Sequence, residues 1–231
     1  MRRAMIRALA ATLACFGASA AQADTIMIDD FTSGALQYYL TSSPAYLSET
    51  HVQTGLADVL GGERDSVCTI TGYLVFNAHV VLGATTGTGS LSVNDDYGIS
   101  SLLELTYPDL DGAQLTGSGL QVEFTTSDLA GATLTFSATA ANSHTGSASQ
   151  TGTTGLMTYF FPYSSFGGAL TPTDFTDVGL DSLVFSVQSM PSQDYSLEAI
   201  KSTDVPEPMT MSLMLLGLGA MGACIRKRRM T

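Results

Sequence analysis

The sequence predicts an all-β protein, a single β-sandwich or jelly roll of about ten to twelve short strands. First, no segment between residues 24 and 204 keeps the 3.6-residue apolar period of an amphipathic helix. Second, several segments alternate apolar and polar residues with a period of two, as half-buried strands do. Third, turn signals such as Gly61-Gly62 and Asp111-Gly112 separate these segments at short intervals. This pattern favours a sandwich over a parallel α/β sheet.

The clearest strands are predicted where the alternation is regular, over residues 102–107, 120–125, 133–140 and 183–187. Further candidates in chain order are 25–31, 36–41, 47–53, 66–71, 73–82, 89–93, 156–161 and 194–200. Residues 137–155 are rich in Ser, Thr and Gly. This composition predicts a mobile loop or a long hairpin tip within the domain.

Residues 1–23 have the pattern of a secretory signal peptide. Three arginines fall within the first seven residues, and an apolar run follows over 8–18. Ala21 and Ala23 form the small-x-small pattern that a signal peptidase accepts, so Asp24 is the predicted mature N-terminus.

Residues 205–231 form a tail in three parts. It consists of Pro206, Glu207 and Pro208, an uncharged run over 209–225, and a basic stop made by Arg226, Lys227, Arg228 and Arg229. The run would span about 25 Å as a helix, a short membrane crossing. The basic cluster marks its cytoplasmic side. The tail therefore predicts a single transmembrane helix, the only part of the chain expected in a membrane.

In its three parts and their order, the tail resembles the PEP-CTERM sorting signal. The resemblance implies that an exosortase recognises and removes the tail, in a Gram-negative bacterium that makes exopolysaccharide or a biofilm matrix. The chain would meet signal peptidase and exosortase, be anchored briefly in the inner membrane, and end at the cell surface or outside the cell.

The delivered domain, residues 24–204, is strongly acidic. It carries two bases, Arg64 and Lys201, and twenty acidic residues, a formal charge of −18. Such a body repels phosphate backbones, so a nucleic-acid partner is excluded. Cys68 is its one cysteine, which rules out an internal disulfide and predicts a buried apolar role.

Four segments of the domain resemble, in their order, galactose-binding-like jelly rolls of the kind found near carbohydrate-binding modules. They are Ile28-Asp29-Asp30-Phe31, residues 61–65, residues 161–166 and residues 174–178. The resemblance implies the jelly-roll fold and suggests carbohydrate as the ligand class.

Clustered carboxylates predict a structural calcium site. Asp95 and Asp96 lie in one predicted loop, and Asp109 and Asp111 lie in another. Carboxylate oxygens in loops are ligands that Ca²⁺ prefers, with ordinary Asx turns as the alternative reading. No other cofactor is expected, because the three histidines lack the spacing of zinc ligands.

No catalytic residue is expected. Glu104 and Glu123 lie on the polar faces of predicted strands and could form the carboxylate pair of a glycan hydrolase or lyase. With twenty acidic residues in the domain, however, such a pair arises readily by chance. The absence of a Gly-x-Ser-x-Gly segment removes support for a serine hydrolase.

Sugar recognition would draw on exposed aromatic side chains. Tyr38, Tyr39, Tyr97 and Tyr163 lie in or beside predicted loops, and Trp is absent. Arg64 either pairs with Glu63, Asp65 or another nearby carboxylate, or contacts a ligand. We therefore expect a non-enzymatic surface or matrix protein, structural or associated with exopolysaccharide. The alternatives are a glycan-active enzyme, a protein-adhesion module and a matrix filler.

Overall fold

A computed structural model describes residues 25–35, 37–40, 48–73, 82–85 and 89–204. The segment Thr25–Val205 forms one compact unit. The predicted signal peptide, the Pro-Glu-Pro segment, the tail helix and the basic stop lie outside the described residues. Within the described ranges, no helix has the length and apolar character needed to cross a membrane.

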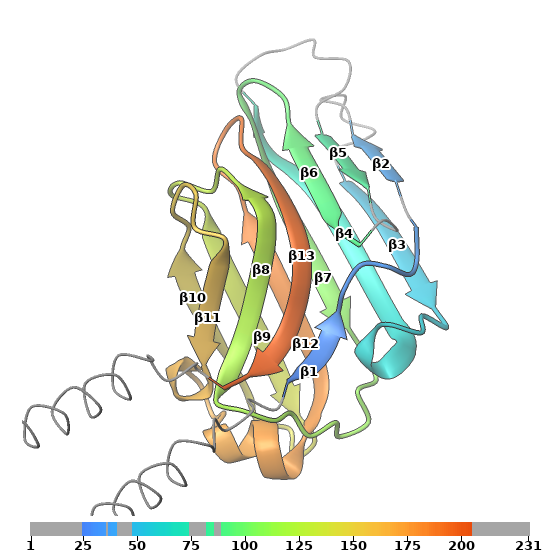
Figure 1. Cartoon of the computed structure of the whole chain (residues 1–231), viewed down its shortest axis with the longest axis vertical. Helices are drawn as coiled ribbons and strands as arrows, with labels where there is room; N and C mark the ends of the chain where they lie inside the picture. Colours follow the sequence, from blue (N-terminus) through green and yellow to red (C-terminus); the bar gives the residue numbers. More distant parts are fainter. Residues whose placement is uncertain (1–24, 36, 41–47, 74–81, 86–88, 205–231) are drawn as a thin grey trace, which may run out of the picture. The chain divides into compact units, whose positions relative to one another are not determined.

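Two antiparallel sheets build this unit, as Figure 1 shows. Sheet A has the order β11-β8-β13-β6-β5-β2, and β1 also pairs with β13. Its strands are β1 (Ile26–Asp29), β2 (Gln37–Leu40), β5 (Leu82–Thr85), β6 (Leu91–Asp95), β8 (Gly119–Ser127), β11 (Thr158–Pro162) and β13 (Asp194–Thr203).

Sheet B has the order β10-β9-β12-β7-β4-β3. Its strands are β3 (Ser48–Thr54), β4 (Glu63–Tyr73), β7 (Ile99–Tyr107), β9 (Thr133–Ala140), β10 (Thr145–Thr151) and β12 (Leu180–Gln188). The predicted all-β sandwich is confirmed.

One hydrophobic core fills the space between the sheets, because alternate residues of each strand point inward. In β7 every second residue from Ile99 to Tyr107 is buried. Phe136 of β9 lies edge-on to Phe161 of β11, with 5.0 Å between ring centroids, and 4.8 Å from Phe185 of β12. These rings join sheet B to sheet A.

The Ser/Thr/Gly-rich segment 137–155 is a hairpin and not a mobile loop. β9 and β10 pair in continuous register from Thr133↔Thr151 to Thr139↔Thr145. One inward position of β10 is a glycine because another part of the chain approaches it closely. A Cβ on Gly146 would lie 1.9 Å from the carbonyl oxygen of Gly167.

Within the described residues, three short helical turns lie outside the sheets: η2 (Leu60–Gly62), η3 (Tyr163–Ser165) and the π-helix η4 (Asp174–Val178). Tyr163 stacks on Phe175 with ring centroids 4.3 Å apart, and Phe166 meets the same ring edge-on at 4.8 Å. The third and fourth segments of the jelly-roll resemblance are therefore packed on each other.

Candidate functional site

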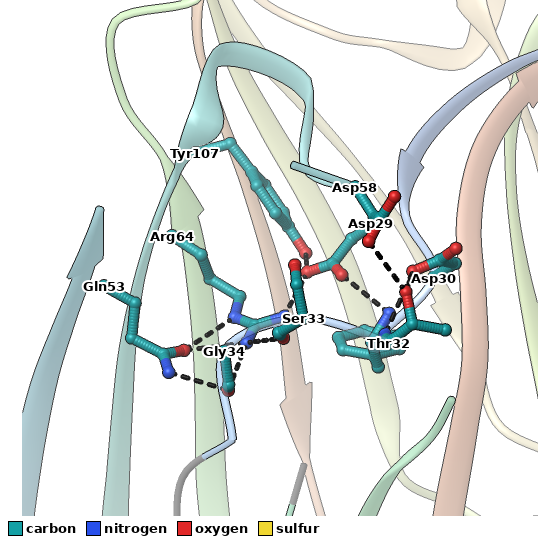
Figure 2. Close-up of polar contacts among 10 residues, drawn as sticks. Asp29, Asp30, Thr32, Ser33, Gly34, Gln53, Asp58, Arg64 and Tyr107 are labelled. Carbon is teal, nitrogen blue, oxygen red and sulfur yellow. Dashed lines mark hydrogen bonds and ion pairs between the residues drawn. The ribbon is translucent and has the colours of Figure 1, made fainter. Parts of the chain in front are cut away.

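Arg64, a candidate for ligand contact, is fully buried in the sandwich (Figure 2). Its Nη1 donates to Oδ2 of Asp29 at 2.7 Å, and the Tyr107 hydroxyl donates to the same oxygen at 2.9 Å. Its Nη2 donates to Oε1 of Gln53 at 2.7 Å and to the carbonyl of Gly34 at 3.1 Å. The guanidinium therefore has a structural role, and a ligand cannot reach it.

Burial is the largest influence on the pKa values of the acidic groups in this cluster. Burial raises the pKa of the Asp29 carboxyl, against the opposing effects of the Arg64 guanidinium and of the hydrogen bonds to the carboxylate. Burial and the Asp29 charge raise the pKa of Tyr107, so its hydroxyl stays a donor at neutral pH. Arg64 also lies 5.5 Å from the centre of the Phe31 ring. The first two segments of the jelly-roll resemblance thus meet here.

Glu104 and Glu123 do not form a catalytic pair. Glu104 alternates with buried Leu103 and Leu105 on β7 of sheet B, so its side chain points out of that sheet. Glu123 alternates with buried residues on β8 of sheet A and contacts Lys201 at 2.6 Å. The hydrophobic core lies between the two carboxylates. One substrate bond therefore cannot contact both of them.

The four carboxylates predicted to bind calcium are not brought together. Asp95 and Asp96 precede β7, whereas Asp109 and Asp111 follow it. The nine residues of this extended strand separate the pairs by on the order of 25 Å. Among the described residues no group of three or more His, Cys, Asp or Glu side chains could hold a metal ion. The described structure therefore does not bring these four residues together in one calcium site.

The candidate aromatic platforms differ in exposure. Tyr163 is buried, and its hydroxyl donates to the carbonyl of Thr116 at 3.0 Å. Tyr97 is 83% exposed on the turn between β6 and β7. The side chains of Tyr38 and Tyr39 lie outside the described part of the structure.

A surface that the sequence did not single out lies on the outer side of sheet B. It consists of the outward positions of β9, β10 and β12, which the strand registers place side by side. We call it the hydroxyl face: Thr133, Thr135, Ser137, Thr139, Thr145, Ser147, Ser149, Thr151, Ser182, Val184, Ser186 and Gln188. Ten of these twelve residues are Ser or Thr, and none is charged.

The registers place the hydroxyls of this face in rows across the three strands. One row is Ser186, Thr135 and Ser149, with the last two hydroxyls 2.8 Å apart. Neighbouring strands lie about 4.8 Å apart, so each row is a closely spaced series of donors and acceptors. An open groove of about 310 Å³ crosses the face and is lined by residues 137–139, 145–147, 182 and 184.

Acidic residues border the hydroxyl face: exposed Asp181 precedes Ser182 in β12, at a register shift, and further charges lie beyond β12. The next strands contribute Glu104 from β7 and Asp65 from β4. The hydroxyl face is thus an uncharged patch at the β10 end of the sheet, on an acidic body. The signal for it in the sequence was the Ser/Thr content of 137–155, which also suggested a loop.

Residues 204–229 match the PEP-CTERM protein-sorting motif. The tail is a PEP-CTERM sorting signal. The motif indicates that the protein is exported and sorted by an exosortase to the cell surface or the extracellular space. No curated protein matches the chain at a significant level of similarity.

Solved structures resemble the body that precedes the PEP-CTERM signal. The family 11 carbohydrate-binding module of a Clostridium thermocellum cellulosomal cellulase has 14% identity and a TM-score of 0.36, over 78% of this chain and 94% of that one. An exo-β-agarase has 13% identity and a TM-score of 0.40, over 79% and 26%. A mutant family 29 carbohydrate-binding module in complex with mannohexaose has 10% identity and a TM-score of 0.32, over 68% and 92%. At this level of similarity none of them assigns a ligand to the chain.

Proposed function

We propose that the protein is a non-catalytic component of the cell surface or extracellular matrix that associates with a neutral exopolysaccharide through the hydroxyl face. The observation that carries this proposal is the concentration of Ser and Thr hydroxyls, without charge, around the groove on β9, β10 and β12. Each hydroxyl offers one donor and two acceptor positions, which suits the hydroxyls of a sugar chain.

The charge of the body favours a neutral glycan over an acidic one. Two bases against twenty acidic residues in 24–204 give a surface that repels uronic-acid or sulfated polymers. Of the two bases, Arg64 is buried and Lys201 is paired with Glu123. A neutral chain on an uncharged patch meets little repulsion of this kind.

Each copy should bind weakly. Hydroxyls on an open surface exchange water for sugar with little net gain per hydrogen bond, and none of the twelve residues of the hydroxyl face is aromatic. Many copies sorted to the same matrix would bind a long polymer by avidity. This behaviour fits a matrix component better than a high-affinity receptor.

The same proposal places the protein in a Gram-negative bacterium. Signal peptidase would remove residues 1–23, the tail would anchor the chain briefly in the inner membrane, and exosortase would release or transfer the body. The non-catalytic role is supported by the separation of Glu104 and Glu123 on opposite sides of the sandwich.

The test is a pull-down of the exported protein on insoluble neutral and acidic polysaccharides. Ser137→Glu places a charge in the groove, and Thr125→Glu makes the same change at an exposed position on β8 of sheet A. We expect the parent protein and Thr125→Glu to be retained on a neutral polymer, and Ser137→Glu to be lost from it.

Equal retention of both variants would exclude the hydroxyl face as the binding surface. Retention of the parent protein on acidic polymers alone would contradict the neutral ligand. Reducing ends or unsaturated products that appear over hours and depend on Glu104 or Glu123 would show an enzyme. The absence of both binding and turnover would favour a matrix filler.

A further inference from the structure

The two ends of the described body lie beside each other. β1 begins at Ile26 and pairs with the last strand, β13, at Ile26↔Ser202. The Oγ1 atoms of Thr25 and Thr203 are 3.4 Å apart. The predicted signal-peptidase site therefore precedes, and the sorting signal follows, the same end of sheet A.

The last residues of β13 are enclosed on both sides. β1 lies along one edge and β8 along the other, with Ser202 opposite Leu120 and Thr203 opposite Gly119. The side chain of Ser202 is fully buried, and Thr203 is 6% exposed.

The loop before β8 also covers the end of β13. The Ser118 N–H donates to the carbonyl of Thr203 at 3.1 Å. Gly117, at φ +81°, packs so closely that a Cβ there would lie 2.3 Å from the carbonyl carbon of Thr203. Only glycine gives this approach, so the carbonyl of Thr203 is covered by protein.

Little chain separates this enclosed end from the sorting signal. Pro206 is three residues beyond Thr203, a reach of at most about 11 Å when fully extended. A processing enzyme must bring the bond it attacks within about 3.5 Å of its reacting atoms, together with the residues on either side of that bond. For a bond near Pro206 those residues include the end of β13.

We propose that the end of β13 controls removal of the tail. The processing enzyme cleaves near Pro206–Pro208 only when Ser202 and Thr203 have left sheet A. Pairing of β13 with β1 and β8 is then the clasp that slows cleavage of the folded protein. This proposal rests on exosortase processing of the PEP-CTERM motif and is independent of glycan binding.

The test locks the clasp in the full-length chain, produced in cells that make the processing enzyme. Thr25→Cys combined with Thr203→Cys places two thiols where the hydroxyls already face each other, a geometry that suits a disulfide. The matched control, Ser92→Cys combined with Ser196→Cys, joins β6 to β13 at paired residues seven positions upstream of Thr203. Mobility with and without reductant shows whether each disulfide has formed.

We expect loss of the cleaved form in the Thr25/Thr203 disulfide, its return with reductant, and normal cleavage of the Ser92/Ser196 control. Six Gly/Ser residues inserted between Thr203 and Asp204 add about 20 Å of reach and leave residues 204–229 intact. This insertion should restore cleavage with the disulfide closed. Normal cleavage of the locked chain would overturn the proposal. So would a block that the insertion does not relieve, because the fault would then lie in folding or export.

Discussion

Arg64 and Asp29 form a fully buried ion pair that joins the start of β4 to the end of β1 across 35 positions of the chain. The pair fixes the first strand of one sheet to an inner strand of the other. The Asp29 carboxylate also accepts a hydrogen bond from the Tyr107 hydroxyl on β7, so it connects side chains of three strands.

Asp29→Ala should lower the free energy of unfolding by about 3–5 kcal/mol, because it leaves the buried Arg64 guanidinium without its counter-charge. Urea unfolding at pH 7 measures this change. Lys201→Ala is the matched control, because it breaks the partly exposed pair with Glu123 and should cost no more than about 1 kcal/mol. Similar losses of unfolding free energy in the two variants would mean that burial does not make the Asp29–Arg64 pair more important for stability than the partly exposed pair.

Arg64→Lys should lower the free energy of unfolding although it keeps the positive charge. A lysine offers one point charge, whereas Arg64 bonds Asp29 through Nη1 and Gln53 through Nε and Nη2 at the same time. We expect a loss of about 2 kcal/mol or more, as for other broken buried networks. Unfolding curves that coincide with the parent's would contradict this geometry.

The sequence predicted the fold class because period-two alternation is a local signal. It also contained the direction of the Arg64 side chain. Adjacent residues of a strand point to opposite faces, so Arg64 shares the inward face of Ser66 and Cys68 and cannot reach Glu63 or Asp65. Its true partner, Asp29, could not be predicted, because strand pairing between distant segments leaves no local mark.

The other differences have similar causes. β10 was not among the predicted strands because its inward positions, Gly146, Ala148 and Gln150, are small or polar and give no apolar alternation. Gly167 approaches the first of them closely. The two acidic loops predicted to share a calcium ion lie apart because the nine residues of β7 extend between them. The hydroxyl face could not be predicted without the register of three strands. One of them, β12, comes from a distant part of the sequence.

Asp95→Asn should stabilise the protein above pH 6. Burial raises the pKa of the Asp95 carboxyl to about 6, against the lowering effect of hydrogen bonds from Ser189 and Ser101. A raised pKa means that the stability of the protonated form is present below about pH 4 and is lost as pH rises through 6. The variant should therefore gain up to about 3 kcal/mol over the parent at pH 7 and nothing at pH 3.5.

Unfolding free energies between pH 3.5 and 8 measure this difference. Asp96→Asn is the control, because the Asp96 side chain is exposed and its replacement should have little effect at any pH. A constant difference between Asp95→Asn and its parent across this range would contradict the assigned ionisation. Ser189 and Ser101 donate to Oδ2 of Asp95, a position that the amide oxygen of asparagine can take.

Asp174→Asn should have the opposite dependence on pH. Burial opposes the charge of this carboxyl, but hydrogen bonds from the N–H of Thr171 at 2.7 Å, from Asn142 and from His144 outweigh it and hold its pKa well below the usual range. The stability that it contributes is present above about pH 4 and is lost as pH falls further. The variant should be less stable than the parent at pH 7, with a difference that shrinks in acid. Thermal melts at pH 7 and pH 2.5 should show this convergence, and a constant gap would rule it out.

The mature extracellular protein should lack its tail. The apolar run of about 25 Å is short for a hydrocarbon core of about 30 Å, which suits a transient membrane stop. Pro206 and Pro208 hold φ near −65° and lack amide protons, so residues 205–208 should be extended and not helical. Mass spectrometry of extracellular material should show peptides ending between residues 205 and 208 and none from 209–231.

Replacement of Pro206, Glu207 and Pro208 by Ala should leave the full-length chain in the inner membrane. Replacement of Thr210 and Ser212 by Ala, inside the apolar run, should leave processing unchanged. Intact tails in the native extracellular protein would show that the sorting signal is not removed.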